Sequence, residues 1–146
     1  MELGSNAAGS RAVTISAVAE AAIRAAVRQS GHIEACGLLF GTPGHIAEAS
    51  LAANVSPTPA HRFEIDPAHL FEAHRRSRAG PLALVGCWHS HPDGRPEPSA
   101  ADRAGVSDES WLWLIATSAG LAAWLPAPAG LSTAGFVPVA LMPVRL

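Results

Sequence analysis

Two histidines and one aspartate stand at a spacing that could hold a single metal ion. His89 and His91 are two residues apart at the end of an apolar run, and Asp102 follows after ten further residues. Alternate side chains of a β-strand point to the same face, so both imidazoles would face one ion. Two imidazoles and one carboxylate leave a fourth position for water, which is typical of catalytic zinc. We therefore predict that His89, His91 and Asp102 bind Zn²⁺.

The local sequence predicts the elements that would position these ligands. Residues 82–91 are expected to form a buried strand, because the segment begins with apolar residues and a proline follows it. Three prolines and an Asp-Gly pair place a loop at 92–98. Ser99 is expected to be the N-cap of a short helix, with Asp102 in its first turn. The loop is long enough to bring this turn to the end of the strand.

Each half of the pattern also has an ordinary explanation. A His-x-His pair occurs by chance among surface and core histidines. Ser99 and Asp102 by themselves match a helix-capping motif, in which an acid in the first turn complements the helix dipole. The two halves joined by one loop are more specific for a metal site than either half alone.

The complete pattern resembles the JAMM motif of the MPN-domain metallopeptidases. The positions that match the motif are Glu34, His89, His91, Ser99 and Asp102. Residues 34–41 are similar to the segment that carries the family's glutamate. Asn54 with its Pro-rich turn, and the run 62–67, extend the resemblance to short prokaryotic members over about residues 12–125.

The resemblance implies a fold and a set of roles. The fold would be α/β, with layered α+β elements: an MPN/JAMM-like mixed β-sheet flanked by helices, with a cytidine-deaminase-like core. Glu34 would be the general base that moves a proton from water to the leaving amine. Ser99 would hydrogen-bond the oxyanion. Without the resemblance, an acid such as Glu34 at the entrance to a strand is expected to be merely solvated.

The resemblance also implies a reaction and a class of substrate. The reaction would be zinc-dependent hydrolysis of a peptide or isopeptide bond next to the C-terminal Gly-Gly of a small ubiquitin-like or sulfur-carrier protein. The tail of that protein could add as a strand to an exposed sheet edge. Two alternatives stay open. One is a non-catalytic MPN-type scaffold or interaction module, a class that generally lacks the metal ligands. The other is a RadC-like protein, although that group typically has Asn at the position of Ser90.

Length and composition indicate one folded domain. The chain has 146 residues, of which 49% are hydrophobic, and we expect a single domain at 11–146 after a flexible tail at 1–10. All ten basic residues are arginine and the net charge is −2. Because no basic stripe is present, nucleic acid is not expected as a partner. Cys36 and Cys87 lie in apolar runs as expected for buried thiols, which fits a reducing compartment. The N-terminus does not resemble a secretory signal, so we expect a cytoplasmic protein.

The C-terminal third contains a long uncharged stretch, residues 110–144. Glycines and prolines divide it into pieces too short to span a membrane as one helix, so no membrane partner is expected. We predict a buried hairpin here, followed by a last strand at 136–144 that its prolines place at a sheet edge. Any exposed part would suit a homodimer contact. The other expected elements are a strand at 13–15, a helix at 16–29, strands at 34–40 and 45–53, and a helix at 67–78.

Overall fold

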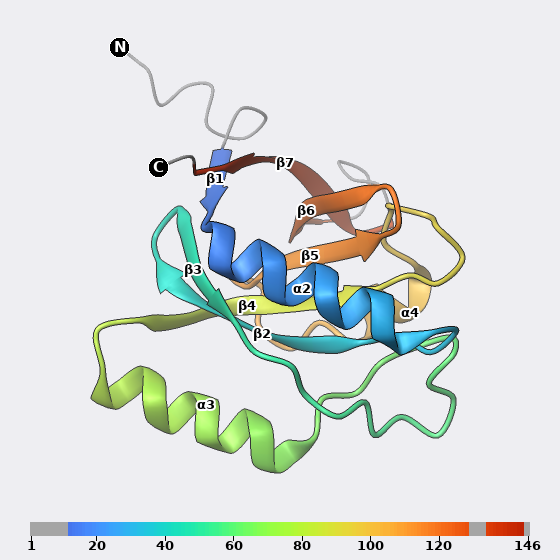
Figure 1. Ribbon diagram of the computed structural model, residues 1–146, viewed down its shortest axis with the longest axis horizontal. Helices are drawn as coiled ribbons and strands as arrows, with labels where there is room; N and C mark the ends of the chain where they lie inside the picture. Colours follow the sequence, from blue (N-terminus) through green and yellow to red (C-terminus); the bar gives the residue numbers. More distant parts are fainter. Residues whose placement is uncertain (1–11, 129–133, 145–146) are drawn as a thin grey trace.

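The computed structural model describes residues 12–128 and 134–144 (Figure 1). The expected tail at residues 1–10 lies outside the described residues. The strands are β1 (Ala12–Ile15), β2 (Cys36–Thr42), β3 (His45–Ala49), β4 (Ala83–Ser90), β5 (Leu112–Thr117), β6 (Gly120–Pro126) and β7 (Phe136–Pro143). The helices are α2 (Ala17–Ser30), α3 (Pro67–Ala79) and α4 (Ala100–Ala104).

The seven strands of the described residues form one mixed sheet that closes on itself. Their order is β1-β3-β2-β4-β5-β6-β7, and β1 pairs in parallel with both β3 and β7. β4 pairs antiparallel with β2 and parallel with β5, so it is a central strand. His89 lies in β4 and His91 follows its last residue, Ser90, so both histidines stand at the end of a strand that is held by neighbours on both sides.

Two long helices pack against opposite faces of this sheet. α2 begins at Ser16, whose hydroxyl accepts a hydrogen bond from the amide of Ala19 at 3.0 Å. Its buried residues, which include Ile23, share a core with Ile15 and Leu114. α3 lies across the other face (Figure 1), where residues such as Ala73 join a second core with Phe40, Trp113 and Phe136. Asp66 caps α3, and a proline occupies its first turn.

The backbones of β2 and its neighbours approach closely beside the predicted site. A Cβ atom added to Gly37 would lie 1.8 Å from the carbonyl oxygen of Ser50 and 2.4 Å from the indole nitrogen of Trp88. Because no side chain can fit this space, glycine is required there. In the pairing of β2 with β4, Cys36 lies opposite His89.

The structure confirms most of the expected elements, but the strand expected at 45–53 ends at Ala49 and the last strand has a different placement from the one predicted. The hairpin is formed by β5 and β6, with Trp113 paired to Trp124 and Thr117 to Gly120. The edge position predicted for 136–144 is wrong, because β7 pairs with β6 on one side and with β1 on the other. Pro138 is compatible with this arrangement, since it lies opposite β6 and pairing with β1 starts only at Ala140.

The predicted likeness of the core to cytidine deaminases stays a prediction.

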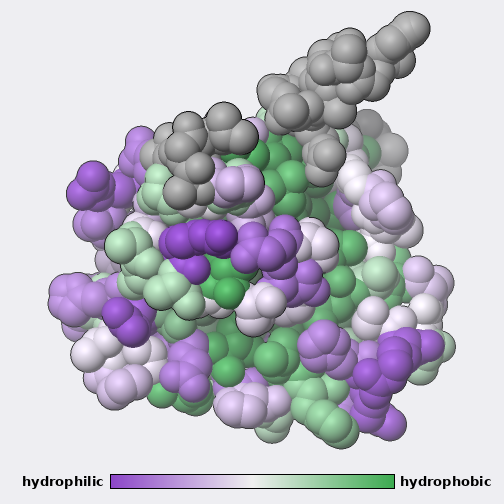
Figure 2. Space-filling model, turned by 180° about the vertical axis from the view of Figure 1, so that it is seen from behind, coloured by the Kyte–Doolittle hydropathy of each residue, from purple (hydrophilic) through white to green (hydrophobic). Residues whose placement is uncertain are grey.

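Apolar residues also reach the surface. Figure 2 shows them in the middle of the back face, bordered by hydrophilic residues. The described helices include none with the length and apolar character that crossing a membrane requires. The uncharged C-terminal stretch instead contributes strands to the two cores, as the burial of Trp113, Leu114, Ile115 and Phe136 demonstrates.

Candidate metal centre

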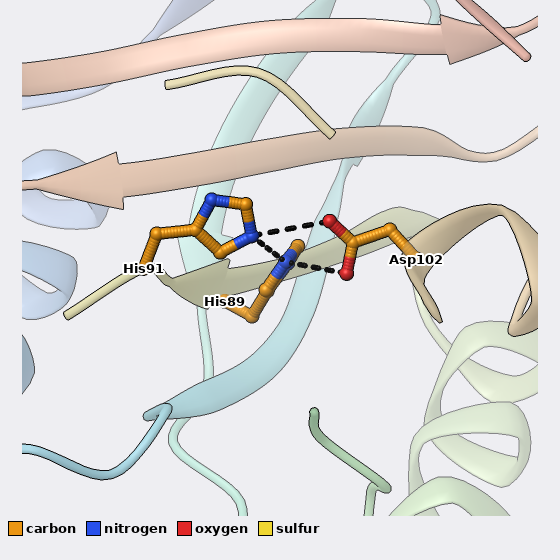
Figure 3. A group of neighbouring side chains, drawn as sticks. All are labelled: His89, His91 and Asp102. Atoms are coloured by element: carbon orange, nitrogen blue, oxygen red, sulfur yellow. Dashed lines mark hydrogen bonds and ion pairs between the residues drawn. The ribbon is translucent and has the colours of Figure 1, made fainter. Parts of the chain in front are cut away.

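Three buried side chains converge at the end of β4 (Figure 3). His89 Nε2 lies 3.1 Å from His91 Nε2 and 3.0 Å from Asp102 Oδ1, and His91 Nε2 lies 3.1 Å from Asp102 Oδ2. All three residues are at most 7% exposed. Among the described residues, these three side chains lie close enough together to hold one metal ion. The structure thus brings together the three residues that the sequence predicts as ligands.

The donor set and its spacing suit zinc. Tetrahedral zinc with bonds of about 2.0–2.2 Å keeps its ligand atoms about 3.3–3.6 Å apart, which is close to the observed spacing. Two imidazole nitrogens and a carboxylate facing one another carry lone pairs directed at a common point. Such an arrangement requires a positive charge between the groups, either a proton or a metal cation.

Neighbouring groups orient each of the three side chains. The Nδ1 atom of His91 is 2.7 Å from the carbonyl oxygen of Arg95, so Nδ1–H can donate there and leave Nε2 facing the centre. The backbone amide of Ser99 donates to Asp102 Oδ2 at 2.9 Å. The ring of His89 is stacked on Phe63 with a centroid distance of 4.4 Å. Its Nδ1 atom is buried without a hydrogen-bond partner, so ring packing orients this side chain.

The protonation equilibria of His89 and Asp102 favour metal binding near neutral pH, whereas that of His91 opposes it, because a metal would have to displace its proton. Burial lowers the pKa of His89, which keeps this imidazole neutral. Burial opposes ionisation of Asp102, but hydrogen bonds from His89 and His91 outweigh it and hold the pKa of this carboxyl below its usual range. Burial also lowers the pKa of His91, yet its bonds to Asp102 and Arg95 raise it overall. Deprotonated ligands are what a divalent cation needs.

Glu34 lies beside this centre and is not solvated. It precedes β2, is only 5% exposed, and its Oε1 atom is buried without a hydrogen-bond partner. Burial, followed by the negative charge of Asp102, raises the pKa of Glu34 to about 7. A carboxyl with a pKa near neutrality can both take up and release a proton at pH 7, which is the requirement for a general base that later acts as an acid.

Two cavities border the centre. One, of about 780 Å³, is lined by Glu34, His91 and Ser99 together with polar loop residues. The other, of about 1010 Å³, reaches Asp102 and has Phe63 and Trp113 among its apolar lining residues. Three of the five motif positions therefore border one cavity.

Ser99 has the capping geometry that the sequence offered as an alternative. Its hydroxyl accepts a hydrogen bond from the amide of Asp102 at 3.1 Å, while the Asp102 carboxylate accepts one from the amide of Ser99. A serine hydroxyl that accepts one bond still has its own proton to donate. Capping and donation to a substrate are thus compatible, and the second role stays a prediction.

Some residues at the centre were not found from the sequence as part of the site. Phe63 stacks on His89, and the carbonyl of Arg95 contacts His91. Both contacts depend on how loops fold over the end of β4. A backbone carbonyl leaves no signal in the sequence. Phe63 precedes the helix that begins at Pro67, and nothing in the local sequence indicates which residue its ring contacts.

Comparisons with known proteins agree on one family. Residues 16–126 match the family described as prokaryotic homologs of the JAB domain. A desampylase from Pyrococcus furiosus is 32% identical over 100 residues, which cover 68% of this chain and 71% of that protein. A CD-NTase/cGAS isopeptidase from Vibrio cholerae is 36% identical over 103 residues, which cover 60% of this chain and 65% of that protein. The chain thus spans slightly less than two thirds of the length of the Vibrio protein.

The fold has a match among solved structures. A JAB1/MPN domain protein from Archaeoglobus fulgidus superimposes with a TM-score of 0.58 over 91% of this chain and 98% of that one, at 15% identity. This likeness concerns the fold, and it agrees with the predicted MPN-like mixed sheet flanked by helices.

Removal of a ligand should abolish tight metal binding. We expect wild-type protein, loaded with zinc and dialysed, to retain one equivalent of zinc, and His89→Ala to retain much less than one, because two protein ligands hold zinc far more weakly than three. Elemental analysis measures both. His69→Ala is the matched control: His69 contacts Ser50 at 2.8 Å and is not one of the three ligands, so it should keep its zinc. Equal zinc contents in all three proteins would contradict the assignment.

The stability of metal-free protein should depend on Glu34 and on pH. Its pKa is about 7 in the folded state against an ordinary value of 4.5. Between these values the folded state retains a proton that the unfolded state has released, so the free energy of unfolding falls as the pH rises. Glu34→Gln removes this contribution. We expect the variant to match wild type near pH 4.5 and to exceed it by up to about 3 kcal/mol above pH 7.

Urea unfolding of both proteins in a chelator measures this difference across the pH range. A difference between the two free energies that stays constant from pH 4.5 to 7.5 would contradict the raised pKa of Glu34.

Proposed function

Because the chain belongs to the family of prokaryotic homologs of the JAB domain, we propose that it is a zinc-dependent isopeptidase. The substrate would be a small ubiquitin-like or sulfur-carrier protein, cut at the bond that follows its C-terminal Gly-Gly. The chain is a hydrolytic enzyme of the JAMM type, as its similarity to a desampylase and an isopeptidase indicates. One observation carries the proposal: a buried, unpartnered carboxylate oxygen of Glu34 lies beside a converging His-His-Asp group.

The metal-binding residues in this proposal are His89, His91 and Asp102. Their nitrogen and oxygen donors are those that zinc prefers, and their separations of 3.0–3.1 Å support a shared ion. When bound, zinc supplies Lewis acidity and makes hydroxide available from water near neutral pH. The remaining chemistry falls to the residues of the chain.

Glu34 is the proposed general base. It would take the proton of the attacking water and deliver it to the amine that leaves when the amide bond breaks. In the metal-free site, burial raises the pKa of Glu34 to about 7, so the carboxyl gains and loses a proton more readily near neutral pH than an exposed glutamate does. Ser99, which borders the same cavity, would donate a hydrogen bond from its hydroxyl to the oxyanion that develops on the scissile carbonyl.

The two cavities suggest how the substrate tail would lie. The predicted addition of the tail to a free sheet edge does not apply to the seven described strands, because each already has two neighbours. The segment 62–65 instead lies along the larger cavity and is held on its other side by Asn54 and Val55. An extended tail beside this segment would bring its C-terminal carbonyl towards Asp102. The apolar lining of this cavity would suit aliphatic side chains of a tail.

Mass spectrometry of cleavage products tests this function. Zinc-loaded protein is incubated with small Gly-Gly-tailed carrier proteins, either extended at the C-terminus or joined to a lysine by an isopeptide bond. We expect products that end at the second glycine, and the isopeptide form should be cut faster than the extended chain. Glu34→Gln should retain zinc but lose at least about 100-fold in turnover, since general-base catalysis contributes about 10²- to 10⁴-fold.

Intact carriers after prolonged incubation with zinc-loaded wild type would contradict the proposed substrate class. Full activity of the zinc-loaded Glu34→Gln protein would remove the base assignment while leaving the substrate class in place.

Ser99→Ala should lower turnover more than it weakens substrate binding. Loss of one oxyanion donor lowers kcat about 10²- to 10³-fold, whereas loss of a helix cap reduces stability by about 0.5–2 kcal/mol. Steady-state kinetics give kcat and KM separately, and Ser99→Thr, which keeps a hydroxyl, should recover most of the rate. Ser16→Ala removes the cap of α2, far from the centre in the sequence, and is the matched control. If both alanine variants lose kcat equally, Ser99 only caps α4.

A further inference from the structure

Asn54 is the most completely hydrogen-bonded side chain next to the proposed base. Its Nδ2 atom donates to the carbonyl oxygen of Glu34 at 2.9 Å and to that of Arg62 at 3.2 Å. Its Oδ1 atom accepts from the amides of Ser56 at 3.0 Å and Glu64 at 3.1 Å. A carboxamide has two donors and can accept two bonds, so all four are used. The side chain thereby joins three separate stretches of backbone.

The backbone of Glu34 is held from both sides by the loop that Asn54 begins. The carbonyl of Glu34 accepts from Asn54, and its amide donates to the carbonyl of Pro59 at 2.7 Å. The next residue, Ala35, donates to the hydroxyl of Ser90 at 2.8 Å and accepts from the amide of Ser90 at 2.9 Å. Ser90 lies between the two histidines. The position of Glu34 relative to the histidines therefore depends on the Ser90 contacts and on the loop.

The side chain of Glu34 has little else to hold it. Its Oε1 atom is buried without a hydrogen-bond partner, so no polar contact at that atom fixes the carboxylate. Glu34 also stands outside β2, which begins at Cys36. Regular sheet pairing does not extend to it. The hydrogen bonds of its backbone therefore set the point from which this side chain extends towards the centre.

We propose that Asn54 is a positioning residue, which acts on catalysis by donating to the Glu34 carbonyl and so fixing the carboxylate of Glu34 beside His91 and Ser99. The inference rests on the proposed function in that Glu34 acts there as the base. A general base must be within hydrogen-bond reach of the proton that it abstracts. A displacement of about 1 Å can reduce a rate about 100-fold. A donor that holds the backbone of the base therefore affects turnover without touching the substrate.

Two variants separate this role from simple support of the loop. Asn54→Asp has the same shape and keeps both acceptor contacts, to Ser56 and Glu64, but loses both donated bonds. Asn54→Ala loses all four. If donation to Glu34 is what matters, both variants should lower kcat about 10- to 100-fold while KM changes less than about twofold and bound zinc stays at the wild-type level. Wild-type kcat in Asn54→Asp would overturn the proposal, because that variant lacks the bond to Glu34. It also lacks the bond to Arg62, and the double-mutant comparison below distinguishes the two bonds.

A double-mutant comparison tests the link to Glu34. In the Glu34→Gln background, measured under single turnover at high enzyme concentration, Asn54→Asp should have no further effect, because its effect acts through the residue already replaced. An equal further loss in that background would overturn the proposal. Ser77→Ala is the matched control: it removes a side-chain bond to the amide of Leu84 at 2.9 Å, and it should leave kcat unchanged.

Hydrogen exchange of backbone amides gives a readout that needs no activity. In Asn54→Asp, the amide of Glu34 should exchange at least about tenfold faster than in wild type, while the amides of Ser56 and Glu64 keep their protection. Unchanged exchange at Glu34 would overturn the positioning role. Because this measurement is independent of turnover, a wild-type protein that fails to cleave any carrier would contradict the proposed function while exchange still decides whether Asn54 holds Glu34.

Discussion

The buried carboxylate of Asp102 imposes the main constraint on this protein. It lies between two imidazoles, with nitrogen–oxygen distances of 3.0 and 3.1 Å, and it accepts a third bond from the amide of Ser99. A buried carboxylate is stable only when hydrogen bonds or a positive charge compensate for the lost water. Without a metal, a proton on His91, whose pKa is raised, would supply that charge, because burial keeps His89 neutral. A divalent cation would take the place of that proton between the three side chains.

The sheet places the three groups with little freedom. β4 is central, paired with β2 and β5, so the ends of three strands are fixed relative to one another. The loop after β4 returns Asp102 on the short helix α4, and the indole of Trp124 holds this loop by donating to the carbonyl of Pro96 at 3.0 Å. Glu34 lies two residues before β2, the other neighbour of β4. His89 lies in β4 and His91 directly follows it, Ser99 and Asp102 belong to the N-terminus of α4, and Glu34 stands in the segment that leads into β2.

Glu34 illustrates how burial converts an ordinary carboxyl into a reactive one. Its Oε1 atom has no hydrogen-bond partner, and burial together with the charge of Asp102 raises its pKa to about 7. Taken alone, an acid at the entrance to a strand is expected to be solvated. The resemblance to a known family implies a different role, and the structure shows the residue buried: Glu34 is 5% exposed, and its backbone is hydrogen-bonded to Asn54 and Pro59 of the loop at 54–61. The burial of Glu34 thus results from tertiary packing and could not be inferred from its residue type.

Local sequence was sufficient for the elements and for the candidate ligands. The spacing of His89 and His91 placed them on one face of a strand, and Ser99 marked the start of the helix that carries Asp102, because strand alternation and helix capping are short-range effects.

Long-range pairing decided the rest. The parallel pairing of β1 with β7 closed the sheet, so the prolines of β7 did not mark an edge. The stacking of Phe63 on His89 and the four hydrogen bonds of Asn54 likewise appear only when distant segments meet. The sequence alone determined which groups could bind a metal, whereas tertiary packing decided which of them are buried, oriented and within reach of one another.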